Sequence, residues 1–164
     1  MTSKGVNPFR FKIAIIIDMK NVKDLKNEFS HLINKIPDFL NQLKNQLKLN
    51  DFDFDNKEVE LVDSWFKVKI SEKEISVDEM INVKKMFFSY CSTLFIRSNG
   101  GEIVLNTKKN TTSYGEPIII NYAAPGYPWV AISVFGWMRI IEKEGGLSKP
   151  LNETILRNLK NKSE

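Results

Sequence analysis

The sequence predicts an α+β domain with helices packed on one face of a small antiparallel sheet. Two observations support this prediction. The first half of the chain repeats apolar residues at intervals of three and four, the period of an amphipathic helix. After Asn99, short runs rich in isoleucine and valine are separated by glycine, proline and polar residues, as in paired strands. Helices followed by a strand pair and further helices favour α+β over a doubly wound parallel sheet.

The 164 residues are the length of one domain, so we expect a single α+β domain over 1–164 with frayed ends at about 1–8 and 161–164. Hydrophobic residues make up 42% and charged residues 27%, as in ordinary globular proteins. One cysteine and one histidine cannot form a structural disulfide or a Cys/His zinc site. The apolar run 13–17 is too short for a membrane span or a signal peptide, which favours a cytoplasmic protein without membrane contact.

The N-terminal part is predicted to contain one strand and two helices. Residues 11–18 are rich in β-branched side chains and predict a strand, with a first helical turn as the alternative. Apolar residues spaced by three and four then predict a helix over 21–35. Pro37 either ends or kinks that helix, and it also suits the first turn of a new helix that continues to about Leu49.

Two capping patterns predict the next helices. Asp55 with Glu58 forms an N-cap pair, and we expect a short helix behind it. Ser76 with Glu79 is a capping box, followed by a broad apolar stripe that continues to about Phe95. The second helix is therefore predicted to be the central and most buried one.

The rest of the chain is predicted as a hairpin and two helices. Asn99-Gly100-Gly101 is a turn, 102–106 and 117–122 are strands, and 107–113 is the long loop between them. After a second loop over 123–128, residues 129–141 form a helix, or a strand in their first half, with Gly145-Gly146 as its C-cap. Residues 150–159 predict a last short helix.

The net charge of +4 raises the question of nucleic-acid binding. However, the chain has 20 lysines against four arginines, and arginine is the better bidentate ligand of phosphate and guanine. The lysines are scattered and often stand beside asparagine. We therefore interpret them as solvated surface and do not expect nucleic acid as the partner.

The catalytic motifs of the common hydrolases, nucleotide-binding proteins and zinc proteases are absent from the sequence. A nucleophile and base formed by Cys91 and His31 is not favoured, because Cys91 falls within an apolar helical stripe and His31 near a helix margin. We predict no catalytic residue, no cofactor and no metal ligand.

Six acidic residues between 51 and 63 are the alternative candidate for a cation site. They lack the glycine and the closing glutamate of a calcium loop, and helix capping explains Asp55 and Glu58 without a metal. Residues 102–108 have the wrong spacing for the carboxylates and lysine of a metal-dependent nuclease. A hydrolase or nuclease using Asp51, Asp53 or Asp63 remains the enzymatic alternative. The acidic set is Asp51, Asp53, Asp55, Glu58, Glu60 and Asp63.

The loops between residues 114 and 129 combine aromatic residues with proline and glycine. Tyrosine and tryptophan dominate protein interfaces, and proline with glycine fixes the shape of a loop. We predict a partner-binding surface formed by Tyr114, Tyr122, Tyr127 and Trp129. The alternative is that Tyr127 and Trp129 fold inward over the core beside Trp137.

The order of these features resembles a group of small uncharacterised bacterial proteins, some of them similar to polymorphic-toxin immunity proteins. The resemblance covers roughly residues 51–146 and includes the helix 87–95, Asn-Gly-Gly-Glu at 99–102, Gly-Glu-Pro at 115–117, Pro128 and the run 134–145. This chain has Ile103 where that group has tryptophan. The resemblance implies no catalytic residues. It supports a non-enzymatic protein-binding domain of the immunity type, with a weak nucleic-acid binder as a further alternative.

Overall fold

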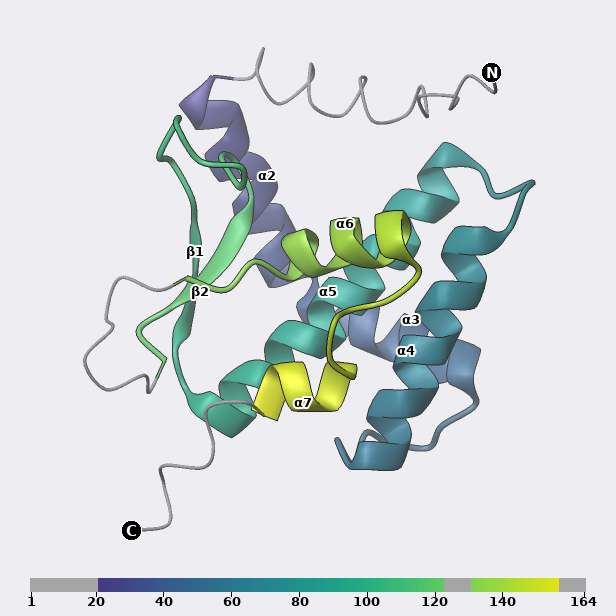
Figure 1. Cartoon of the computed structure of the whole chain (residues 1–164). Helices are drawn as coiled ribbons and strands as arrows, with labels where there is room; N and C mark the ends of the chain where they lie inside the picture. The colour runs from purple at the N-terminus through teal and green to yellow at the C-terminus, as the bar shows by residue number, and fades with distance from the viewer. Residues whose placement is uncertain (1–20, 123–130, 157–164) are drawn as a thin grey trace, which may run out of the picture.

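The structure is a computed structural model that describes residues 21–122 and 131–156 (Figure 1). The strand predicted over 11–18, the loop over 123–128 and the frayed ends at 1–8 and 161–164 lie outside the described residues. The described elements, in chain order, are α2 (Val22–Asn34), α3 (Ile36–Leu47), α4 (Asn56–Ser71), α5 (Val77–Asn99), β1 (Glu102–Leu105), β2 (Pro117–Ile120), α6 (Val134–Glu144) and α7 (Leu151–Leu156).

Helices α2 and α3 are separate helices joined by Lys35, where the backbone leaves the helical region. Asn21 caps α2 by accepting a hydrogen bond from the Asp24 amide at 3.0 Å. Pro37 lies in the first turn of α3, where its missing N–H costs no helical hydrogen bond. The alternative in which Pro37 begins a new helix is therefore the correct one.

Helix α4 begins as predicted, because the Asp55 carboxylate accepts a hydrogen bond from the Glu58 amide at 2.8 Å. The expectation of a short helix is wrong, since α4 has 16 residues. Its buried face continues past Phe66 to Ile70, which also packs against the core. The salt bridge between Lys67 and Asp63, at 2.6 Å, supports the same turns from the outside.

Helix α5 is the central element of the fold. Ser76 caps it through the Glu79 amide at 3.1 Å, and it continues to Asn99, four residues beyond the predicted end, where Gly100 takes a positive φ of 74°. It contacts α3, α4, α6 and α7. The ring of its Phe87 stacks on Phe66 of α4 with 4.0 Å between the centroids. The prediction that this helix is the most buried one is confirmed.

Strands β1 and β2 form the predicted antiparallel hairpin, with Ile103 opposite Ile119. Ile132 pairs with the other edge of Ile119 through two backbone hydrogen bonds of 2.9 Å. Of the predicted segment 129–141, the structure thus describes one bridged residue, Ile132, and a helix that begins at Val134 and continues to Glu144, beyond the predicted end. Gly145 ends α6 in the left-handed conformation.

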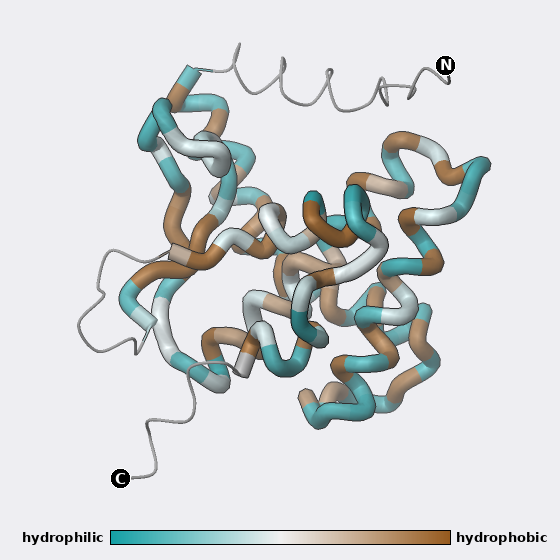
Figure 2. The backbone as a smooth tube through the Cα atoms, in the orientation of Figure 1, coloured by the Kyte–Doolittle hydropathy of each residue, from teal (hydrophilic) through white to brown (hydrophobic). Residues whose placement is uncertain are grey.

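The helices pack against the two-stranded sheet, which confirms the predicted α+β class. In Figure 2 the paired strands are brown over their facing lengths, whereas the loop at the far end of the hairpin is teal and white. Ile119 and Pro117 point from β2 into the interior, and Ile103 of β1 packs against the same core. The hairpin thus contributes one apolar face to the core and carries a polar loop away from it.

Candidate contact surface

The loop that joins β1 to β2 is built around the side chain of Asn106, and we call residues 107–115 the Asn106 loop. Asn106 is buried, and its Nδ2 donates hydrogen bonds to Thr111 Oγ1 at 2.8 Å and Ser113 Oγ at 2.7 Å. Its Oδ1 accepts from the Lys108 amide at 3.1 Å. One side chain therefore binds three points of the loop from the inside and fixes its shape.

Backbone hydrogen bonds close the Asn106 loop at its base. The Asn106 amide donates to the Glu116 carbonyl at 2.9 Å, and the Gly115 amide donates to the Asn106 carbonyl at 2.8 Å. The Tyr114 amide donates to the Thr111 carbonyl at 3.2 Å. These hydrogen bonds hold the loop from within, and the side chains of Lys108 and Lys109 are exposed on it.

An ion pair joins the base of this loop to helix α6. Glu116 is 13% exposed, and both of its carboxylate oxygens accept hydrogen bonds from the Arg139 guanidinium, the Nη2 contact measuring 3.1 Å. Ser133, which caps α6 through the Gly136 amide at 2.9 Å, also approaches the Glu116 carboxylate. Glu116 directly precedes β2, so its ion pair with Arg139 links the start of β2 to α6.

Two of the four predicted contact residues, Tyr114 and Tyr122, lie within the described part of the chain, and they differ in burial. Tyr114 is half-buried on the Asn106 loop. Tyr122 is only 7% exposed and packs edge-on against Phe95 with 5.1 Å between the ring centroids, so little of its side chain is accessible to a partner. Tyr127 and Trp129 lie outside the described residues. Trp137 is half-buried and lies 6.3 Å from the Phe95 ring.

Tyr122 turns inward because β2 ends earlier than predicted. Asn121 adopts a positive φ of 55°, which interrupts the alternation of a strand, and its side chain donates to the Glu102 carboxylate at 2.6 Å. The residue after this turn is directed toward α5. The alternation of apolar and polar residues expected of a strand did not indicate that the chain turns at Asn121. The only local signal was the asparagine itself, a residue that is enriched at positive φ.

Within the acidic segment 51–63, Glu58 anchors the chain at the start of α4. Glu58 is 7% exposed, and its carboxylate accepts hydrogen bonds from the amides of Asp53 at 2.8 Å and Phe54 at 3.1 Å and from the Tyr90 hydroxyl at 2.7 Å. Burial, and then the adjacent Glu58 carboxylate, raises the pKa of Tyr90 far above its ordinary value. Tyr90 therefore remains a neutral hydrogen-bond donor to a buried carboxylate.

Aromatic rings cover this anchor. Phe54, at a positive φ of 57°, stacks on Tyr90 with 5.3 Å between the ring centroids, and Phe52 lies 5.4 Å from the same ring. The Arg97 guanidinium lies over the outer face of Phe54 at 4.5 Å. The sequence predicted the capping role of Asp55 but not this buried pair, because Glu58 and Tyr90 are 32 residues apart.

Cys91 and His31 do not form a nucleophile and base. Cys91 is fully buried on α5, where burial, followed by the charge of Asp63, raises the pKa of its thiol. His31 is exposed on α2. A buried thiol that resists ionisation is a small apolar core residue, as the sequence predicted.

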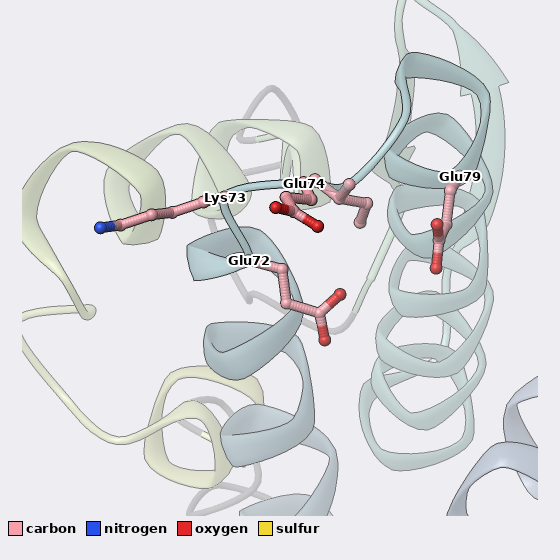
Figure 3. Close-up of a pocket in the computed structure, with 5 residues that line it drawn as sticks. Glu72, Lys73, Glu74 and Glu79 are labelled. Carbon is pink, nitrogen blue, oxygen red and sulfur yellow. The ribbon is translucent and has the colours of Figure 1, made fainter.

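A hollow with a volume of about 390 Å³ lies at the turn between α4 and α5 (Figure 3). It is open and lined by Glu72, Lys73, Glu74, Ile75 and Glu79. Glu72 forms a salt bridge with Lys69 at 2.9 Å, and Glu79 stands in the first turn of α5 as part of its capping box. No group of three or more His, Cys, Asp or Glu side chains in the described ranges is arranged to hold a metal ion.

No protein-family model, curated protein or solved structure matches this chain. Within residues 21–122 and 131–156, none of the helices combines the length and the apolar character needed to cross a bilayer.

Proposed function

We propose that this chain is a non-enzymatic protein-binding domain that contacts its partner through the Asn106 loop. The observation that carries the proposal is the buried Asn106 side chain, which binds the loop at three points. A loop that is ordered before binding loses less conformational entropy when a partner docks, so more of its contact energy becomes affinity. A loop that served only to connect the two strands would not need a buried amide side chain at its centre.

The chemistry of the loop favours an acidic partner. Lys108 and Lys109 are both exposed on it, and the whole chain carries a net charge of +4. Complementary charge steers two proteins together and rejects partners of the same sign. The half-buried ring of Tyr114 supplies the amphipathic contact typical of interface hot spots. Tyr127 and Trp129, predicted from the sequence, are further candidate contact residues.

The resemblance to immunity-type proteins supports a narrower form of this proposal. In that form the domain is a cytoplasmic inhibitor that covers an acidic surface of a toxin protein. An inhibitor of a nuclease usually imitates the acidity of nucleic acid, so a positively charged domain suits a toxin of another kind. A gene for a large secreted toxin beside the gene for this chain would support that role, and a metabolic gene context would argue against it.

The direct test is affinity capture from the native host with the wild-type chain and a loop variant, Lys108→Glu/Lys109→Glu. A matched control, Lys143→Glu/Lys149→Glu, makes the same change of charge at exposed lysines on and after α6. We expect a specific protein to be lost with the loop variant and kept with the control. A second capture with Tyr127→Ala/Trp129→Ala tests the predicted aromatic extension. Identical partners for all variants would remove these loops from the proposed function.

A further inference from the structure

The hydrogen-bond pattern of the hairpin shows which backbone groups of β1 point away from β2. Ile119 of β2 exchanges two hydrogen bonds of 2.9 Å with Ile132, on the side of β2 away from β1. Ile103 lies opposite Ile119, so these two residues form a pair without mutual hydrogen bonds. The amide and carbonyl of Ile103, and by alternation those of Leu105, therefore point to the outer edge of β1.

This outer edge is open among the described residues. The backbone of Asn106, one position further along, bonds toward β2 at Glu116 and Gly115, which confirms the alternation. Within residues 21–122 and 131–156, no hydrogen bond from outside the hairpin reaches the backbone of Ile103 or Leu105. Helix α2 contacts β1, but the backbone groups inside a helix bond to one another and cannot fill a strand edge.

Residues 11–18 have the composition of a strand that suits this edge. They are rich in β-branched side chains and apolar at the consecutive positions 13–17. Such a run is typical of a strand in a sheet that is apolar on both faces. The hairpin is apolar on both faces, because one face packs against the core and the other carries three half-buried side chains, Val104, Ile118 and Ile120.

The connection to α2 keeps this segment within reach of β1. Three residues separate Asp18 from Val22, the first residue of α2, so these two residues are at most about 14 Å apart. Helix α2 in turn contacts β1. In Figure 1, α2 begins at the end of the molecule that carries the Asn106 loop, and β1 runs toward that loop. A segment that lies along β1 and then joins α2 must therefore run in the same direction as β1.

We propose that residues 11–18 pair with the outer edge of β1 as a parallel third strand of the sheet. Their backbone supplies the hydrogen-bond partners that Ile103 and Leu105 lack among the described residues. A third strand also stabilises a sheet that would otherwise be a single hairpin. The same pairing covers an edge to which a strand of another chain could add. This role is independent of partner binding by the Asn106 loop.

Amide hydrogen exchange in the full chain, followed by NMR, tests the pairing with an internal control. The Val104 amide points toward β2 and is bonded in either case. With the third strand in place, the amides of Ile103 and Leu105 should exchange as slowly as that of Val104. Nuclear Overhauser cross-peaks should also join these two amide protons to α protons of residues 11–18. Fast exchange at Ile103 and Leu105, or the absence of these cross-peaks, would overturn the third strand.

Two proline variants locate the strand that protects the edge. Ile15→Pro removes an amide and disrupts a strand at the middle of the segment, so exchange at Ile103 and Leu105 should accelerate by about tenfold or more. Exchange at Val104 should change by less than about twofold, and slow exchange along α5 shows that the variant is folded. Val6→Pro is the matched control outside the segment and should change none of these rates. Protection in the wild-type chain that increases with protein concentration would assign the edge to a second copy and overturn the proposal.

Discussion

Replacing Tyr90 with phenylalanine tests whether the buried Glu58 carboxylate holds the chain at the start of α4. The substitution removes one hydroxyl and keeps the aromatic ring, so the stacking with Phe54 at 5.3 Å remains. What is lost is the 2.7 Å hydrogen bond from the Tyr90 hydroxyl to Glu58 Oε1. Two backbone amides still donate to the carboxylate, at 2.8 and 3.1 Å, so Glu58 loses one of its hydrogen-bond donors and keeps these two.

The expected magnitude follows from the charge and the burial of the acceptor. A hydrogen bond to a charged group contributes about 1.5–3 kcal/mol, and both partners here are almost completely shielded from water. We therefore expect Tyr90→Phe to lower the free energy of unfolding by about 2 kcal/mol. For a chain of this length, that corresponds to a fall of about 4–8 °C in Tm.

Urea denaturation followed by circular dichroism measures this change, with Tyr114→Phe as the matched control. The Tyr114 hydroxyl makes no hydrogen bond with another described residue, so removing it should change the free energy of unfolding by less than about 0.5 kcal/mol. If Tyr90→Phe were as stable as this control, the buried pair would not be an anchor and the account of the acidic segment would be wrong.

Four further predictions concern separate parts of the fold. The free energy of unfolding should decrease as the pH rises above about 9, because the buried Cys91 thiol keeps its proton in the folded chain while the unfolded chain loses it. Denaturation series at several pH values measure this slope, and Cys91→Ala should reduce it by up to about 1.4 kcal/mol per pH unit. Gly101→Ala should cost about 2 kcal/mol or more, since φ is +101° and the new Cβ would lie 2.7 Å from a β2 carbonyl oxygen. Gly145→Ala, in the left-handed region at φ 74° and with open space around the new Cβ, should cost only about 1 kcal/mol, and equal losses in thermal melts would contradict this account. Asn106→Ala should accelerate amide hydrogen exchange throughout residues 107–115 by about tenfold or more while α5 stays protected, and unchanged exchange would show that the amide does not order the loop. Arg139→Met should lower the free energy of unfolding by only about 1 kcal/mol, because the guanidinium is partly exposed. A double-mutant cycle with Glu116 should attribute most of that loss to the ion pair.

The sequence predicted most of the helices because their signals are local. Capping residues such as Asp55 and Ser76 act within three residues of the helix start, and the apolar period of 3.6 is repeated over several turns. The ends of elements were harder to predict. Helix α5 continues to Asn99, although the apolar stripe that predicted the helix ends near Phe95. The stop is imposed by the glycine pair at 100–101 and its positive φ values.

The candidate contact surface was less predictable because its organisation depends on contacts between distant or unusual residues. Tyr122 looked like an exposed aromatic residue, but the positive φ of Asn121 turns it into the core. The role of Asn106 had a weak local signal, since an asparagine two residues before an amide can form a turn with its own side chain. Its burial, and hence its importance, depends on how the hairpin packs and could not be read from the residues themselves.

The position of α7 has a consequence for how the chain is made. Leu151 and Ile155 are buried against α4 and α5, although α7 is translated after both of these helices. Until the ribosome has released these residues, the apolar sides of two earlier helices remain exposed to water and to other nascent chains. A nonsense codon before Pro150 should therefore yield an aggregation-prone product that demands chaperones, even though every element of the hairpin and its loop has already been synthesised.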